Sequence, residues 1–227
     1  MRRTALFHLL FLLLGLVLGA CLMFFANAMG WLGPLPSLLQ GGDRPLPAMS
    51  ISPSADPAAP EGNEVLVARA MEVAVLLRDR DWAGLSAAVH PEKGVCFTPY
   101  SSVSEGDLVF SAGEVAAFGS DGKSYIWGYS DGRGAPMSMT PADYFARFVF
   151  NADFTQAPLL AVNRVQVYGN AVENVADAYP EGSFVEFYYD GLDPANEGFD
   201  WCALKLVFQS WNGQLMLVGI IHSEWTI

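Results

Sequence analysis

Hydrophobic and polar positions divide the chain into a leader, a linker and a domain. The leader is an almost unbroken apolar run from Ala5 to Ala26, preceded by Arg2 and Arg3. A helix needs roughly 20 apolar residues to cross a bilayer, so this run is long enough to span one. Basic residues in front of such a run favour a cytoplasmic N-terminus. Residues 1–30 are therefore predicted to be a membrane anchor or signal segment, with the remaining chain outside the cytoplasm.

Three alternatives exist for the fate of this leader. The first is a retained single anchor that crosses the membrane through residues 5–26. In the second, Leu18-Gly19-Ala20-Cys21 resembles a bacterial lipobox, which makes Cys21 a lipidation candidate. In the third, Ala26-Asn27-Ala28 has the A-x-A form of a cleavage site. The apolar residues after Cys21 and the length of the run favour the retained anchor. Each alternative places the folded part outside the cytoplasm, and the retained anchor holds it at the cell membrane, in the bacterial envelope.

The composition changes abruptly after the leader. Seven of the fourteen prolines fall between Gly33 and Gly62, among serine, glycine and alanine. A segment of this kind cannot bury enough apolar surface to fold and is typical of an extended tether. We expect residues 31–62 to be a Pro-rich disordered linker. Residues 63–227 then form one extracytoplasmic domain.

The first part of this domain has the apolar spacing of helices. The residues that recur at helical spacing are Leu66, Ala70, Val73 and Leu77. They predict an amphipathic helix that ends around Arg80. Asp81 can cap a second, shorter helix that stops before Pro91. Capping signals at Ser111 and Thr140 predict two further helices.

The last third of the domain has the apolar pattern of strands. Residues 159–168 and 183–189 are rich in apolar, β-branched and aromatic side chains, with a short helix expected around 172–179. Alternation over 202–208 and an apolar run over 215–221 flank Asn212-Gly213, which is a strong hairpin signal. Helices followed by a long antiparallel sheet predict an α+β fold with the helices packed on one face.

The order of these elements resembles the nuclear transport factor 2-like (NTF2-like, SnoaL-like) cone. In that fold a curved sheet wraps a long N-terminal helix and leaves a pocket at its wide end. Three motifs also resemble an uncharacterised family of exported bacterial lipoproteins. They are His90-Pro91-Glu92-Lys93-Gly94-Val95 with Phe97-x-Pro99-Tyr100, Asp200-Trp201 with Leu204-x-Leu206-Val207-Phe208, and Val218-Gly219-Ile220-Ile221-His222 with Trp225-Thr226-Ile227. The resemblance covers about Glu64 to Ile227 and implies fold and location, without an activity.

Cys96 and Cys202 are the two cysteines of the predicted domain. An oxidising compartment favours a disulfide between them. The alternative is two separately buried thiols, because cysteine packs as a small hydrophobe. The resemblance implies arginine at both positions, and paired replacement by cysteine is consistent with a bridge. Cys96 and Cys202 are therefore disulfide candidates.

The charge balance makes nucleic acid a poor partner for this chain. Its formal net charge is −12, and two of the twelve basic residues lie in the leader. The exported part is therefore still more acidic. Such a surface repels phosphate backbones, and solvation is the simplest explanation of the acidity.

Motifs of catalysis and metal binding are weak. Gly128-Tyr129-Ser130-Asp131-Gly132 has the G-x-S-x-G pattern, but the following glycines and Pro136 exclude the helix that a nucleophile elbow requires. We interpret it as a turn. The acidic loop 190–200 lacks the ligand spacing of an EF-hand, and no histidine or cysteine spacing indicates zinc. We therefore predict no metal site, no cofactor and no catalytic residues.

A ligand site is expected only if the cone leaves a pocket. The aromatic residues that could line it are Tyr125, Trp127, Tyr144, Phe148, Tyr188 and Trp201, although aromatics at such spacing are usually core. The candidate ligand-binding residues are Arg164, Glu186, Tyr188, Trp201 and His222. The predicted function is non-catalytic binding of a small molecule or an envelope protein. The alternative is an envelope enzyme with His90 or His222 as acid/base.

Overall fold

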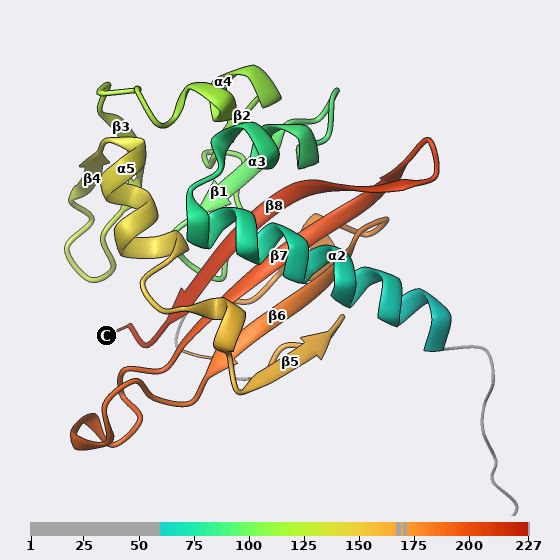
Figure 1. Ribbon diagram of the computed structural model, residues 1–227. Helices are drawn as coiled ribbons and strands as arrows, with labels where there is room; N and C mark the ends of the chain where they lie inside the picture. Colours follow the sequence, from blue (N-terminus) through green and yellow to red (C-terminus); the bar gives the residue numbers. More distant parts are fainter. Residues whose placement is uncertain (1–59, 167–168, 170–171, 227) are drawn as a thin grey trace, which may run out of the picture. The chain divides into compact units, whose positions relative to one another are not determined.

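The computed structural model describes residues 60–166, 169 and 172–226 (Figure 1). The predicted anchor, the lipidation candidate Cys21 and nearly all of the predicted linker lie outside these residues. None of the helices in the described ranges combines the length and apolar character needed to traverse a bilayer. The domain itself is an α+β fold with a curved, mixed sheet, which confirms the predicted fold class at that level.

Two helices open the domain as the apolar spacing predicts. Helix α2 (Pro60–Asp79) begins three residues before Asn63, the first residue of the predicted domain. All four residues that define its predicted apolar face are buried. Helix α3 (Trp82–Ala88) is capped by Asp81, whose Oδ1 accepts a hydrogen bond of 2.9 Å from the Gly84 amide.

Shorter helical turns connect the strands. Ser111 and Glu114 form the predicted capping box at the start of α4 (Ala112–Ala117). Thr140 caps α5 (Pro141–Tyr144), which continues as the π-helical turn η1 (Phe145–Val149). The remaining turns are η2 (Phe154–Gln156), α6 (Val175–Ala178) and η3 (Pro194–Asn196).

Six strands form the main sheet in the order β2-β1-β8-β7-β6-β5. Their bounds are β1 (Val95–Thr98), β2 (Leu108–Phe110), β5 (Leu159–Val162), β6 (Ser183–Tyr189), β7 (Cys202–Trp211) and β8 (Gln214–Glu224). All neighbours are antiparallel except β1 and β8, which are parallel, so the predicted all-antiparallel sheet is wrong at this pair. The two strands come from opposite ends of the domain sequence, and no hairpin turn imposes an antiparallel direction on them.

Local turn signals are confirmed. Asn212 and Gly213 join β7 to β8 with φ of 48° and 78°, which is the left-handed geometry of a two-residue hairpin turn. Strands β3 (Tyr125–Tyr129) and β4 (Pro136–Met139) form a separate two-stranded sheet. The G-x-S-x-G motif is therefore the end of a strand and a turn, as interpreted. Strand β5 ends at Val162, six residues before the predicted end, because Asn163 takes a positive φ of 50°.

Both faces of the main sheet are covered. Helix α2 crosses the front face, over β6, β7 and β8 (Figure 1). On the back face, Val175 of α6 packs with residues of the sheet in a second apolar cluster. The sheet residues of that cluster are Phe184, Val207, Val218 and Ile221. The expectation that helices pack on one face only is therefore wrong, because the segment between β5 and β6 returns over the other face.

Cys96 and Cys202 are both free and buried, so the predicted disulfide is not formed. Cys96 lies opposite Gly219 of β8, whereas Cys202 lies opposite Glu224 of the same strand. These positions are roughly 16 Å apart along β8, beyond the roughly 7 Å that a disulfide allows between Cα atoms. The paired-replacement argument fails, and the alternative of separate core thiols describes this structure.

Thiol labelling checks this correction. Burial raises the pKa of Cys96 and of Cys202 to about 12, so neither thiol should react with iodoacetamide in the native protein. After denaturation without reductant, peptide mapping should find both cysteines alkylated. Labelling of neither cysteine until a reductant is added would contradict the free thiols.

Candidate functional site

Aromatic side chains that were candidates for lining a pocket pack into a closed core. Phe97 is fully buried, and its ring centroid lies 5.7–6.1 Å from those of Phe118, Trp127, Tyr144 and Phe145. The Trp127 and Tyr144 rings stack at 3.8 Å. The Trp127 indole N–H donates to the Met139 carbonyl at 2.9 Å. Trp127 and Tyr144, named as pocket candidates, therefore belong to the core.

His222 is sealed behind this aromatic core. It is 1% exposed, and the Phe148 ring lies 5.6 Å from its own. Its Nε2 is 3.3 Å from Oε2 of Glu224, which Arg147 binds through both carboxylate oxygens at 2.9 and 2.6 Å. Its Nδ1 has no hydrogen-bond partner among the described residues. Burial lowers the pKa of His222, which keeps the imidazole neutral at pH 7.

Acid should therefore weaken the fold through His222. Its folded pKa lies below the ordinary 6.5, so its contribution to stability is complete above pH 6.5 and is lost as the pH falls below it. The unfolding free energy should decline between pH 7 and 5.5, and His222→Asn should remove this decline. Urea unfolding at several pH values measures both.

Two carboxyls with shifted pKa, Glu224 beside His222 and Glu186 on the other face of the sheet, do not obscure this test. Burial alone would raise the pKa of Glu224, but hydrogen bonds from His222 and Arg147 outweigh it and lower the pKa to about 2. Its contribution is therefore lost only between pH 4.5 and about 2. Burial raises the pKa of Glu186, which makes stability increase as the pH falls, in the wild type and the variant alike. An unchanged pH dependence in His222→Asn would contradict the assignment.

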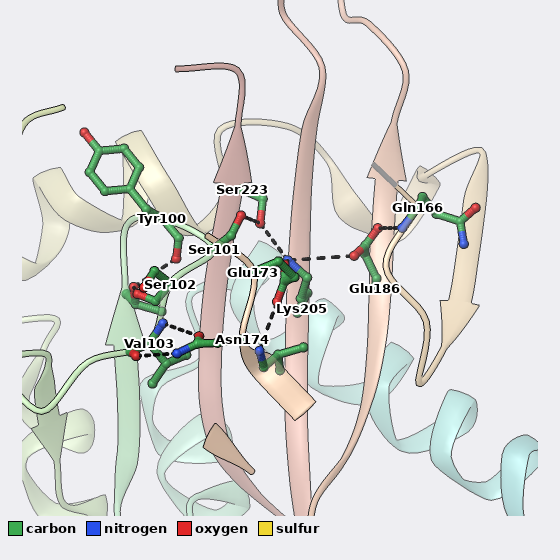
Figure 2. Close-up of polar contacts among 12 residues, drawn as sticks. Tyr100, Ser101, Ser102, Val103, Gln166, Glu173, Asn174, Glu186, Lys205 and Ser223 are labelled. Atoms are coloured by element: carbon green, nitrogen blue, oxygen red, sulfur yellow. Dashed lines mark hydrogen bonds and ion pairs between the residues drawn. The ribbon is translucent and has the colours of Figure 1, made fainter. Parts of the chain in front are cut away.

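A buried charged cluster lies on the back face of the sheet (Figure 2). Lys205 is fully buried in the middle of β7. Its Nζ lies 2.7 Å from Glu173 Oε2 and 3.8 Å from Glu186 Oε2, and it donates to Ser223 Oγ at 2.7 Å. Buried charges require such partners, because desolvation costs several kcal/mol per ion. We call Lys205, Glu173, Glu186 and Ser223 the lysine cluster.

Glu186 is the least satisfied member of the lysine cluster. Its Oε1 accepts a hydrogen bond of 2.9 Å from the Gln166 amide, whereas Oε2 has no hydrogen-bond partner within the described ranges. Burial raises the pKa of Glu186, and the nearby Lys205 ammonium opposes that rise. The cluster thus places two carboxyl groups around one ammonium.

The lysine cluster attaches two irregular segments to the sheet. Ser101 donates to Ser223 at 2.9 Å, which binds the segment after β1. The Asn174 side chain accepts from the Val103 amide at 2.8 Å and donates to the Val103 carbonyl at 2.9 Å, so the segment before α6 is bound to the same region (Figure 2). These contacts make the cluster a structural clamp.

Two small clefts open beside this clamp. One has a volume of about 220 Å³ and is lined by residues around α6, Arg164 and Glu173 among them. The other, of about 150 Å³, lies between α6 and the back face. Ligand pockets for drug-sized molecules usually measure about 300–1,000 Å³. Both clefts are therefore smaller than a typical small-molecule site.

A larger groove lies between α2 and the β7–β8 turn. Its volume is about 430 Å³, and its lining includes Val65, Arg69 and Leu215. Arg69 Nε donates to the Leu215 carbonyl at 3.1 Å, and its Nη1 binds Glu72 at 3.0 Å. The guanidinium of Arg69 is thus already paired, and Val65 is 62% exposed. The groove is a solvent-facing surface.

The structure does not bring the five predicted ligand residues together. Arg164 is exposed at the 220 Å³ cleft, and Glu186 is buried in the lysine cluster. The ring centroids of Tyr188 and Trp201 lie 6.2 Å apart. His222 lies on the opposite face of the sheet from Glu186. Sequence reasoning missed Lys205, although it is the only charged residue between Cys202 and Phe208.

The other candidates for chemistry have structural roles. His90 is buried, and its Nδ1 accepts hydrogen bonds from the amides of Glu92 and Lys93 at 3.2 and 3.1 Å. It therefore stabilises the turn before β1. Within the described residues, no group of three or more histidine, cysteine, aspartate or glutamate side chains has the arrangement of a metal site.

Comparison with known proteins does not assign a family. No known protein-family profile and no curated protein matches the chain. Among solved structures, a designed NTF2-like protein is similar to it, with a TM-score of 0.32 and 11% identity over 72% of this chain and 99% of that chain.

Proposed function

We propose that this chain is a non-catalytic, membrane-tethered domain that binds a partner protein in the bacterial envelope. The observation that carries the proposal is the filled interior. Aromatic side chains that were candidates for lining a pocket pack into a closed core, and the charged groups beneath the surface are paired with one another. Recognition must then use the outer surface of the domain.

The location rests on the leader. An apolar run long enough to span a bilayer follows two arginines, and the exported part is strongly acidic. The NTF2-like assignment is also a proposal. It is supported by a long first helix that crosses one face of a curved sheet (Figure 1). The chain would then be a form of that fold in which side chains of the protein itself close the interior of the cone.

The arrangement of the histidines disfavours the enzyme alternative. A general base must come within about 2.6–3.2 Å of the proton that it removes, directly or through one water. His222 is 1% exposed, and His90 is buried with both of its short Nδ1 contacts made to backbone amides. Neither histidine is accessible to a substrate in this structure.

Site-specific photo-crosslinking in cells tests the proposed function. A photoreactive amino acid is placed in the full chain, one position at a time, on separate surfaces. The test positions are Val65, Val109, Tyr129, Leu160 and Phe199, all of which are exposed. We expect a discrete adduct from one surface and none from the others. Absence of an adduct at every position would overturn the proposal. The location is tested separately: protease added to spheroplasts should cleave the domain only if the domain lies outside the cytoplasm.

A further inference from the structure

We propose that an exposed aromatic surface at one end of the sheet binds a basic, partly apolar segment of the partner protein. This surface, the aromatic end, consists of Phe199 and Trp225. The inference rests on the proposed function and specifies where the partner binds and what chemistry it presents.

The aromatic end joins the β6–β7 loop to the segment after β8. Phe199 is 62% exposed and Trp225 is 41% exposed, yet their rings meet edge to face with centroids 5.5 Å apart. Antiparallel pairing of Cys202 with Glu224 places the loop and the end of β8 side by side (Figure 1). Leu192, also in the loop, is 47% exposed. Solvent-facing aromatics that already contact each other are typical of binding surfaces, where aromatic residues contribute most of the affinity.

Hydrogen bonds within the loop brace the segment that carries Phe199. Asp200 Oδ2 accepts hydrogen bonds from the Asp193 amide at 2.7 Å and from Asn196 Nδ2 at 2.9 Å. Asp193 caps the turn η3 through the Ala195 amide at 2.9 Å, and the Phe199 amide donates to the Asn196 carbonyl at 2.9 Å. A loop ordered before binding loses little conformational entropy when a partner arrives.

The negative charge of the loop that carries Phe199 indicates a basic partner segment. Residues 190–200 contain four carboxylates, Asp190, Asp193, Glu197 and Asp200, and no lysine or arginine. Arg147, the cation bound to this end of β8, is neutralised by both oxygens of Glu224. An exposed aromatic pair on a loop with four carboxylates, three of them on exposed residues, is complementary to lysine and arginine side chains. The faces of the two rings can also attract those cations directly.

The same charges disfavour other occupants. An anionic lipid surface would be repelled by the four carboxylates. A second copy of this chain would meet the same patch across a two-fold axis, which opposes like charges. A basic segment that alternates cationic and apolar residues satisfies both the carboxylates and the rings.

A defined peptide tests the aromatic end. The full chain is inserted in nanodiscs of zwitterionic lipid, and the fluorescence anisotropy of a labelled twelve-residue peptide that alternates arginine and leucine is measured. A matched peptide of glutamate and leucine is the control. We expect only the arginine peptide to bind, and binding should weaken when the salt concentration rises from about 50 to 500 mM.

Variants locate the binding on this surface. Phe199→Ala and Trp225→Ala should each weaken binding about tenfold or more, since exposed aromatics act as anchors of interfaces. Glu197→Lys should weaken it through charge alone. The matched control is Tyr129→Ala, because Tyr129 has the same 62% exposure as Phe199 and lies on β3. It should leave the affinity unchanged.

Other outcomes would overturn the inference. They are equal binding of the two peptides, full affinity of Trp225→Ala, binding to anionic vesicles in place of the peptide, and self-association that Trp225→Ala abolishes. A crosslinked adduct from another surface, together with no peptide binding at the aromatic end, would overturn this inference and leave the proposed function intact. Absence of adducts at every position would overturn both this inference and the proposed function.

Discussion

Replacing Lys205 with methionine should destabilise the folded domain by about 3–5 kcal/mol, the cost of breaking a buried ion pair by removing one partner. Lys205 has no exposed surface, and its ammonium lies 2.7 Å from Glu173 and 3.8 Å from Glu186. Methionine fills a similar volume but leaves the two carboxyl groups without a cation. Urea unfolding of the full chain in mild detergent, followed by tryptophan fluorescence, measures the change.

A compensating variant separates charge from packing. Adding Glu173→Gln and Glu186→Gln to Lys205→Met removes the unpaired carboxylates and should restore most of the lost stability, because replacing a whole buried ion pair is often neutral. A loss below about 1 kcal/mol in Lys205→Met alone would show that the lysine cluster does not hold the back face together. Equal losses in the single and triple variants would mean that packing dominates.

Phe97→Ala should destabilise the domain by about 3–5 kcal/mol, as large-to-small substitutions of buried aromatics do. Phe97 is fully buried in β1, and the Trp127, Tyr144 and Phe145 rings surround it at 5.7–6.1 Å. Removing it leaves a cavity in the aromatic core. The same urea unfolding experiment gives the free energy.

Two controls accompany this prediction. Tyr129→Ala removes an aromatic ring that is 62% exposed and should change the unfolding free energy by no more than about 0.5 kcal/mol. Phe97→Leu should cost less than Phe97→Ala, because more of the cavity stays filled. If Phe97→Ala retained wild-type stability, the interior would not be the closed aromatic core described above.

Local sequence patterns predicted the elements that depend on neighbouring residues. The spacing of Leu66, Ala70, Val73 and Leu77 identified the buried face of α2 before any contact was known. Asn212-Gly213 identified the hairpin, because few other residues adopt the positive φ of that turn without strain. Helical periodicity and turn geometry are properties of residues within a few positions of each other, so one segment suffices to reveal them.

Contacts between distant segments were not predictable in the same way. The parallel pairing of β1 with β8 joins strands from opposite ends of the domain, and neither strand specifies its direction. The role of Lys205 depends on Glu173, which the fold brings beside it from a distant segment. The expected oxidising compartment and the presence of two cysteines favoured a disulfide between Cys96 and Cys202. The two residues lie too far apart along the sheet to form one.

The sequence by itself therefore determined the α+β class, the main helices and hairpins, and the expectation of an exported, acidic domain. Only the tertiary structure decided that Trp127 and Tyr144 stack within the core, that His222 is sealed from solvent, and that Phe199 meets Trp225 at an exposed end. The physical reason is that secondary structure follows local backbone preferences. Burial and charge pairing depend on which distant surfaces the folded chain brings into contact.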